Sequence, residues 1–141
     1  MARRTSLVEH LTSIPMFAAC TRKELQTLSR LATEIDVAEG KVLTKEGEPG
    51  HEFIIVVEGE ASASRRGRTV ATFGPGDYFG EIALLDPGER TATIVAKTPM
   101  VLAVIGPAEF GSALDEVPTL ARKIMRGLAR RLREVDNPKV S

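Results

Sequence analysis

Hydrophobic side chains recur at helical spacing in two runs within residues 6–33. Pro15 follows the first run, and a residue before proline disfavours helix, so that helix should end there. The second run begins after Thr21, with Glu24 three positions on. This pair has the pattern of a capping box, in which each side chain satisfies a backbone amide of the other residue. The spacing therefore predicts two N-terminal helices. Their apolar positions are Leu7, Val8, Leu11, Ile14, Leu25, Leu28 and Leu31.

Between residues 34 and 105 the pattern changes to short β-branched runs, which glycines separate at regular intervals. Short strands with glycine punctuation indicate an antiparallel sandwich or barrel. Residues 53–57 are apolar without alternation, as is typical of a central strand covered on both faces. The expected strands are 34–37, 41–44, 52–57, 60–65, 69–73, 91–96 and 100–105.

Helical spacing returns after Gly106 and continues to residue 135. Pro107 fits the first position of a short helix over residues 108–114. A longer amphipathic stripe starts at Pro118 and is interrupted only by Gly127. Glycine costs a helix interior roughly 0.5–1 kcal/mol relative to alanine, so we expect this helix to be soft there. The predicted fold class is α+β. An antiparallel β-roll (a jelly-roll-like barrel, 34–105) is flanked by N-terminal helices (6–33) and a C-terminal helix pair (107–135), in one domain, 1–141.

Charge is balanced in total but not in its distribution. The 141 residues carry 19 basic and 19 acidic side chains, which argues against a dedicated nucleic-acid binder. Residues 34–89 hold twelve acidic and five basic side chains, whereas residues 118–135 hold six basic ones and one acidic. A solvated basic helix beside an acidic β-body explains this. The alternative is that Arg122, Lys123, Arg126 and Arg130 screen an anionic ligand or dock on an acidic partner.

Several classes of protein are disfavoured by what the chain lacks. Cys20 is the only cysteine, so no intrachain disulfide can form, and its neighbours lack metal-ligand spacing. His10 and His51 are far apart in sequence, with no set of ligands beside them. No apolar run approaches the roughly 20 residues that cross a bilayer. The first residues lack the apolar region typical of a signal peptide, and the sequence has no motif for a nucleophile, a metalloprotease or a P-loop. We therefore expect a cytoplasmic protein that is not an enzyme, without metal or cofactor, and with no membrane or nucleic-acid partner.

The most informative chemistry lies in residues 79–93. Arg90 offers a planar, permanently charged fork that matches two phosphate oxygens. The carboxylate of Glu81 can accept hydrogen bonds from sugar hydroxyls. Gly80 allows close approach of the backbone, and an apolar turn that starts at Glu81 would present unpaired N–H groups to an anion. The combination suits a phosphate joined to a hydroxyl-bearing sugar.

The same segment resembles the phosphate-binding cassette of the cyclic nucleotide-binding domain family. The family pattern is roughly F-G-E-[LI]-A-L-L, a short loop, then R-[ATS]-A-[TS]. Every position of this pattern has a matching residue in the chain. The matching residues are Phe79, Gly80, Glu81, Ile82, Ala83, Leu84, Leu85, Arg90, Thr91, Ala92 and Thr93. The wider resemblance runs from about Leu11 to Val135 and implies the family's β-roll.

The resemblance also implies roles for single residues. Arg90 corresponds to the arginine that holds the cyclic phosphate, and Glu81 to the glutamate that binds the ribose 2′-hydroxyl. Backbone N–H groups of Ile82, Ala83 and Thr91 would complete the cradle. The last helix would cap the base. The pocket for the base is expected around two small residues of the roll, Ala63 and Ala71.

The resulting hypothesis is a bacterial-type regulatory module that binds cAMP, or less favourably cGMP, and relays occupancy in signal transduction. On binding, the short helix would shift and the terminal helix would swing over the base, which is allosteric coupling. Thr91 is compatible with guanine as the base of the nucleotide but does not select guanine over adenine. The stripe of the terminal helix either packs on its own roll or forms a homodimer or effector contact.

Two other hypotheses stay open. One is a protein-interaction domain that keeps the fold without binding nucleotide. The other is a nucleic-acid binder, which would need aromatic platforms that one tyrosine and no tryptophan do not supply. Since little sequence follows the last helix, we expect either a stand-alone sensor, which the Met1-Ala2-Arg3-Arg4 start favours, or a piece of a larger protein.

Overall fold

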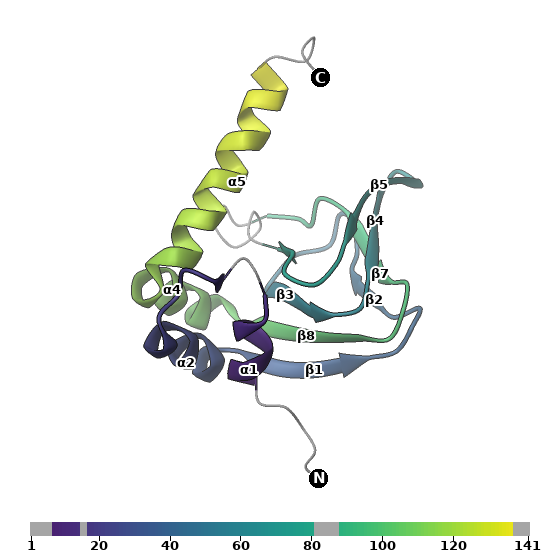
Figure 1. Ribbon diagram of the computed structural model, residues 1–141. Coiled ribbons are helices and arrows are strands. Elements are labelled where there is room, and N and C mark those ends of the chain that lie inside the picture. Colours follow the sequence, from purple (N-terminus) through teal and green to yellow (C-terminus); the bar gives the residue numbers. More distant parts are fainter. Residues whose placement is uncertain (1–6, 15–16, 81–87, 137–141) are drawn as a thin grey trace.

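The structure is a computed structural model that describes residues 7–14, 17–80 and 88–136, without the side chains of residues 131 and 134–136. Helices come first, strands follow, and helices return, in the predicted order (Figure 1). The described elements are α1 (Leu7–Thr12), α2 (Arg22–Leu31), β1 (Thr33–Val37), β2 (Val42–Thr44), β3 (Phe53–Glu58), β4 (Ala61–Arg65), β5 (Arg68–Phe73), β6 (Tyr78–Phe79), β7 (Thr93–Ala96), β8 (Met100–Ile105), α4 (Pro107–Glu116) and α5 (Pro118–Asp136).

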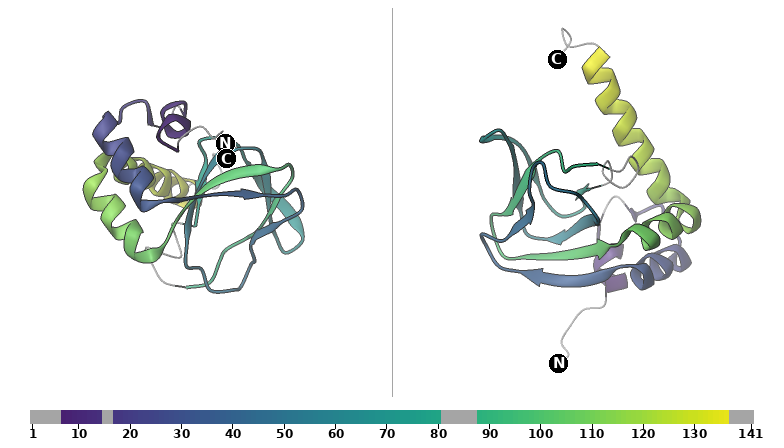
Figure 2. Two further views of the ribbon diagram at one scale, coloured as in Figure 1. Left: turned by 90° about the horizontal axis from the view of Figure 1, so that it is seen from below. Right: turned by 180° about the vertical axis from the view of Figure 1, so that it is seen from behind.

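The strands form two four-stranded antiparallel sheets. Their orders are β1-β8-β3-β6 and β2-β7-β4-β5. Successive strands such as β1 and β2, or β3 and β4, belong to opposite sheets, so short turns join the sheets at one end. The sheets spread apart toward the helices (Figure 2). The predicted antiparallel β-roll of jelly-roll type is confirmed, although the two sheets do not close into a barrel.

Strand β3 lies at the junction of two hydrophobic cores. Phe53, Ile55 and Val57 face the helices, whereas Ile54 and Val56 face the opposite sheet. All five side chains are buried, which explains why the strand lacks polar alternation. The expectation of a strand covered on both faces is confirmed.

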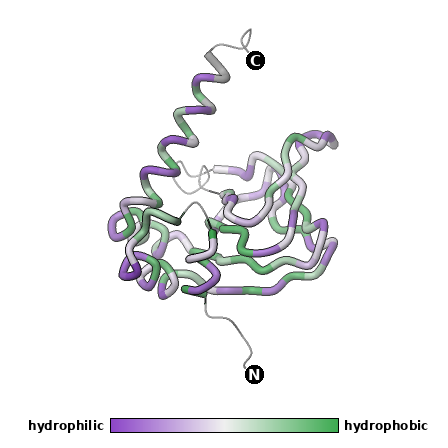
Figure 3. Tube along the Cα trace, viewed as in Figure 1, coloured by the Kyte–Doolittle hydropathy of each residue, from purple (hydrophilic) through white to green (hydrophobic). Residues whose placement is uncertain are grey.

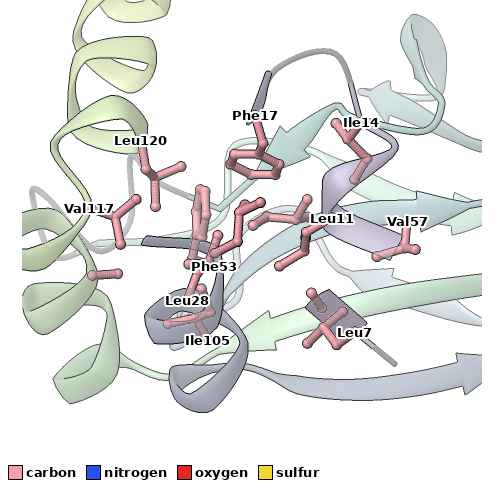
Figure 4. Close-up of a cluster of buried hydrophobic side chains, with 14 of the residues drawn as sticks. Leu7, Leu11, Ile14, Phe17, Leu28, Phe53, Val57, Ile105, Val117 and Leu120 are labelled. Carbon is pink, nitrogen blue, oxygen red and sulfur yellow. The ribbon is translucent and has the colours of Figure 1, made fainter. Parts of the chain in front are cut away.

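The helices pack on the outer face of the sheet that contains β3 (Figure 4). Leu11 of α1, Leu28 of α2, Val117 and Leu120 surround Phe53, and the exposed fraction of each of these side chains is at most 1%. Each buried aliphatic side chain of this size contributes about 1.5–3 kcal/mol to folding, before the entropy of ordering it is counted. The predicted capping box is present at the start of α2. Glu24 N–H donates to Thr21 Oγ1 (3.0 Å), and Thr21 N–H donates to Glu24 Oε1 (2.9 Å).

Helix α5 packs on the body from its start as far as Leu128 and then extends away from it (Figure 1). Leu120 and Ile124 are buried, whereas Met125 and Leu132 are 59% and 65% exposed. Hydrophobic and hydrophilic stretches alternate along the projecting part (Figure 3). The sequence analysis left two roles open for the apolar stripe of α5. The buried residues pack on the protein's own body, and the exposed ones remain for contact with another protein. Across the described part of the chain, no helix combines the length and apolarity needed to span a membrane.

The capping box generates a test of the helical layer. Thr21→Ala removes the acceptor for Glu24 N–H and should lower the free energy of unfolding by about 1 kcal/mol. Thr21→Ser keeps a hydroxyl oxygen in the same place and should unfold almost like the parent. Urea denaturation followed by circular dichroism measures both. Equal stabilities for the alanine and serine variants would show that the cap contributes nothing.

Candidate functional site

The backbone of Arg90 is held by the turn that precedes β3. Its N–H donates to the carbonyl of Glu48 (2.7 Å), and its carbonyl accepts from Gly47 N–H (3.0 Å). An isolated β-bridge between Pro49 and Glu89 extends this pairing. The sequence analysis assigned residues 46–50 no role in the site. The structure shows that this turn positions the arginine.

The guanidinium of Arg90 lies between two glycines. A Cβ added at Gly50 would come within 2.6 Å of Nε, and one added at Gly80 would come within 2.7 Å of Nη1. Gly80 also has a φ of +96°, and an added Cβ there would collide with the carbonyl of Glu52. Because no side chain fits at either position without displacing the arginine, the two glycines define its place. The neighbour that the structure gives Gly80 is Arg90, and the close approach to a ligand expected at Gly80 stays a prediction.

The hydrogen bonding of this guanidinium is incomplete. Nη2 donates to the carbonyl of Glu52 (3.0 Å). Nη1 is buried, and within the described residues it has no hydrogen-bond partner. A buried donor without a partner loses its hydration without compensation, at a cost of about 1–3 kcal/mol. An acceptor brought by a ligand would remove that cost.

Burial also sets the electrostatics of the site. Removal from water lowers the pKa of Arg90 below its ordinary value, and the carboxylate of Glu52 opposes part of this shift. Arginine nevertheless remains protonated at physiological pH, so the site keeps a full positive charge. A desolvated cation with an unused N–H is suited to bind an anion with two or more oxygens, such as a phosphate.

The structure brings some of the predicted site residues together. Gly80 and Arg90 are in direct proximity, and Thr91 follows with an exposed side chain. The carbonyl of Thr91 accepts from Arg65 Nε (2.9 Å), a contact that sequence reasoning missed. Glu81, Ile82 and Ala83 lie outside the described residues, so their predicted roles remain predictions.

The two alanines predicted to line a base pocket are direct partners across β4 and β5. Because Ala63 pairs with Ala71 in an antiparallel ladder, their side chains share one face of the sheet. Ala63 is buried in the core between the sheets, whereas Ala71 is exposed. Strand β5 is the edge of its sheet, which accounts for the difference. Ala71 can form a wall that a ligand touches, with Ala63 beneath it.

The β4–β5 hairpin is tied to the segment that follows Arg90. Besides the bond from Arg65, the backbone N–H of Glu46 donates to Thr93 Oγ1 (3.0 Å), and its carboxylate accepts from Arg66 N–H (3.0 Å). These hydrogen bonds join residues that are far apart in sequence, and no local sequence pattern predicts them. They join the expected base wall to the segment that follows the arginine.

A separate cavity of about 360 Å³ lies between the sheets at the edge formed by β1 and β2. Its wall is mostly aliphatic, and Arg90, Ala63 and Ala71 do not line it. The lining residues are Thr33, Ile35, Val37, Lys41, Val42, Leu43, Glu52, Ile54, Leu102, Val104 and Gly106. An apolar wall suits a phosphate poorly, so the anion chemistry belongs to the surroundings of Arg90.

The remaining candidates do not form a site in the described chain. His10 contacts Glu34 (2.7 Å) and Glu58 (3.5 Å), and His51 is exposed. Among the described residues no group of three or more His, Cys, Asp or Glu side chains could hold a metal ion. Burial raises the pKa of the Cys20 thiol, which disfavours the reactive thiolate. The basic side chains of α5 named above, at positions 122, 123, 126 and 130, are exposed.

The unpaired donor generates a stability prediction. Arg90→Met keeps much of the side-chain volume but removes the desolvated cation. In the absence of ligand, the free energy of unfolding should therefore stay within about 1 kcal/mol of the parent value or rise. Arg65→Met, which removes a satisfied hydrogen bond, should lower it by about 0.5–1 kcal/mol. Urea denaturation compares the two. A loss above about 2 kcal/mol for Arg90→Met would make Arg90 a structural residue instead.

Comparison with known proteins assigns the chain to a family. A model of the cyclic nucleotide-binding domain matches residues 34–117. The chain is 33% identical over 122 residues to a cAMP-dependent protein kinase regulatory subunit of Hypocrea atroviridis, covering 86% of this chain and 26% of that protein. It is 29% identical over 134 residues to a CRP-like cAMP-activated global transcriptional regulator of Mycobacterium tuberculosis, covering 92% of this chain and 60% of the regulator.

A solved structure agrees with these relationships. The catabolite activator protein of Thermus thermophilus superimposes with a TM-score of 0.78 at 31% identity, over 86% of this chain and 60% of that protein. The chain thus spans about a quarter of the fungal subunit and three-fifths of each bacterial protein. These relatives are regulators, and they come from both fungi and bacteria. The chain belongs to the cyclic nucleotide-binding domain family.

Proposed function

We propose that this chain is a cytoplasmic cyclic nucleotide sensor that binds cAMP in preference to cGMP inside its β-roll. The observation that carries the proposal is the guanidinium of Arg90, which is partly desolvated between Gly50 and Gly80 with Nη1 unpaired among the described residues. A cyclic phosphate supplies the acceptor oxygens and the negative charge that this group lacks. The names of both sequence relatives contain cAMP, which supports the choice of nucleotide.

Each part of the nucleotide has an assigned partner in this proposal. Arg90 and the N–H groups of Ile82, Ala83 and Thr91 bind the cyclic phosphate. Glu81 accepts a hydrogen bond from the ribose 2′-hydroxyl. The base lies along the face that Ala63 and Ala71 share, where the exposed Ala71 leaves room for a ring.

Occupancy is relayed through the C-terminal helices. Helix α4 packs on β3 through Phe110, and α5 follows it after a single residue, Val117. The projecting half of α5 is free of the body and can move to cover the base. A ligand shifts such an equilibrium only by its differential affinity for the two positions of the helix. In this mechanism the protein catalyses no reaction and needs neither metal nor cofactor.

A second candidate function rests on the exposed apolar residues of α5. Met125 and Leu132 lie on a helix that extends into solvent, where an uncovered apolar stripe favours contact with another protein. A homodimer or an effector contact fits this surface. The contact is compatible with nucleotide sensing, but it would also serve a domain that binds no nucleotide.

The first test is calorimetric titration of the purified chain with cAMP and cGMP in parallel. The parent should bind cAMP with micromolar or tighter affinity and cGMP more weakly. Arg90→Ala should remove most of the affinity for both, because the phosphate loses its charge-assisted fork, while circular dichroism shows an intact fold. If Arg90→Ala bound as tightly as the parent, the site would be misassigned. No heat and no thermal shift with either nucleotide would favour the protein-interaction alternative.

A matched pair of glycine variants tests the position of Arg90 without removing its charge. Gly50→Ala places a Cβ against the guanidinium, whereas a Cβ at Gly74 meets nothing within 4 Å, and neither glycine has a positive φ. Gly50→Ala should weaken cAMP binding about tenfold or more, and Gly74→Ala should leave it unchanged. Equal affinities for the two variants would contradict the geometry described for the site.

Glu81→Ala tests the ribose contact. Both nucleotides carry the same sugar, so the substitution should weaken cAMP and cGMP binding by a similar factor. Titration of the variant with each nucleotide gives the ratio of the two affinities. A large change in that ratio would count against a ribose role for Glu81.

A further inference from the structure

Tyr78 joins the strand that leads to the candidate site with the helical layer. It belongs to β6 and precedes Gly80 by two residues. Its ring centroid lies 5.5 Å from that of Phe53, which in turn lies 4.9 Å from that of Phe110 on α4. The tyrosine ring is thus held in the core on which α4 packs.

The hydroxyl of Tyr78 reaches the backbone of α5 at Gly127. A Cβ added at Gly127 would come within 2.7 Å of this hydroxyl oxygen. The hydroxyl also lies 3.4 Å from the carbonyl oxygen of Lys123, which is the helical acceptor four residues before Gly127. A distance of 3.4 Å is long for an O–H···O hydrogen bond, so shape dominates this contact. The missing side chain at position 127 forms a notch that the tyrosine hydroxyl occupies.

Gly127 stands where α5 begins to leave the body. Before it, Leu120 and Ile124 are buried; directly after it, Leu128 is half-buried against the same core, and the described side chains from Ala129 onward are exposed. Glycine weakens a helix interior, so its presence needs a reason other than helix stability. The close approach of Tyr78 supplies that reason, and the weakened helix makes the same place suited to bending.

The other end of β6 leads to Gly80, which lies beside the guanidinium of Arg90. Gly80 lies against Nη1 of Arg90, and Tyr78 is two residues away on the same short stretch of backbone. Phe79, between them, is buried and pairs with Ile54 of β3, which fixes the stretch in the sheet. Any displacement of this backbone on phosphate binding therefore moves the tyrosine that contacts α5.

We propose that Tyr78 is a positioning residue for α5: its hydroxyl occupies the notch at Gly127 and transmits movement of the strand beside Arg90 to the helix. This inference rests on the proposed function, because it names the contact through which nucleotide occupancy reaches α5. The coupling is steric and acts where the helix is weakest.

The chain offers a matched control for its test. Gly127→Ala fills the notch and should push α5 away from β6. The helix then has farther to move before it covers the base. Gly111→Ala places the same substitution in α4, where the added Cβ meets nothing within 4 Å. Both variants gain helix propensity, but only the first meets Tyr78. Tyr78→Phe removes the hydroxyl and keeps the ring on Phe53, so it should restore the fit in a Gly127→Ala background.

Two readouts separate positioning from plain packing. The first is the affinity for cAMP by calorimetry, which Gly127→Ala should weaken about fivefold or more. Gly111→Ala should leave it unchanged, and adding Tyr78→Phe to Gly127→Ala should bring it back toward the parent value. The second readout exploits Tyr78 being the only tyrosine of the chain. An isotope label at tyrosine Cζ gives a single nuclear magnetic resonance signal, which should shift on cAMP binding and on Gly127→Ala, but not on Gly111→Ala.

The outcomes distinguish this inference from the proposed function. If cAMP binds but the Tyr78 signal does not move, and Gly127→Ala binds like Gly111→Ala, the positioning role is wrong and the sensor function stands. If Tyr78→Phe fails to rescue Gly127→Ala, the contact is not the coupling element. If the parent binds neither cyclic nucleotide, the proposed function fails and the relay fails with it.

Discussion

The two-sided burial of β3 is the constraint on which the rest of the structure depends. One face of this strand carries the core beneath the helices, and the other carries the core between the sheets. The carbonyl of Glu52, just before the strand, accepts from Arg90. Phe53, its first residue, contacts both Tyr78 and Phe110. A single strand thus joins the candidate site, the strand beside it and the C-terminal helices, so each of these is placed relative to the others by packing that cannot be loosened locally.

Within that framework the candidate site is a local exception to good packing. Most buried polar groups in folded proteins are paired, and each unpaired one calls for an explanation. At Arg90 the proposed function would supply that explanation: the fold holds a cation partly out of water and leaves one donor without a partner among the described residues, which a bound phosphate would satisfy. The cost is local, because the backbone on either side of the arginine is fully engaged with the turn at residues 47–50. The stability supplied by the two cores offsets the cost of this one unpaired donor.

Much of the fold could be predicted from sequence because its signals are local. The capping box at Thr21, the unbroken apolar run in β3 and the proline starts of α4 and α5 all depend on neighbours within a few residues. Strand β6 was not expected, since two residues carry no periodicity, and it exists only because β3 pairs with it. For Gly127, sequence analysis predicted a soft point in the helix, but the nearby hydroxyl of Tyr78 comes from a distant strand.

The candidate site likewise combines contacts that the sequence could predict with contacts that it could not. Arg90 and Gly80 belong to one contiguous motif, and their proximity could be anticipated. Gly50 and Arg65 enter the site from other strands and turns, through contacts that only the assembled roll creates. Ala63 and Ala71 were both expected near the base pocket, and the edge position of β5 leaves Ala71 open and Ala63 covered.

The packing of one arginine against two glycines also bears on how related sequences should vary. Gly80 has a left-handed backbone, so glycine is favoured there whether or not an arginine lies beside it. Gly50 has no such constraint, and only the guanidinium excludes a larger side chain. In a relative that has lost the arginine, position 50 is released from this restriction and is free to accept any small residue. The identity of that residue, far from the motif in sequence, should therefore vary with whether a member of the family keeps an arginine at the position of Arg90.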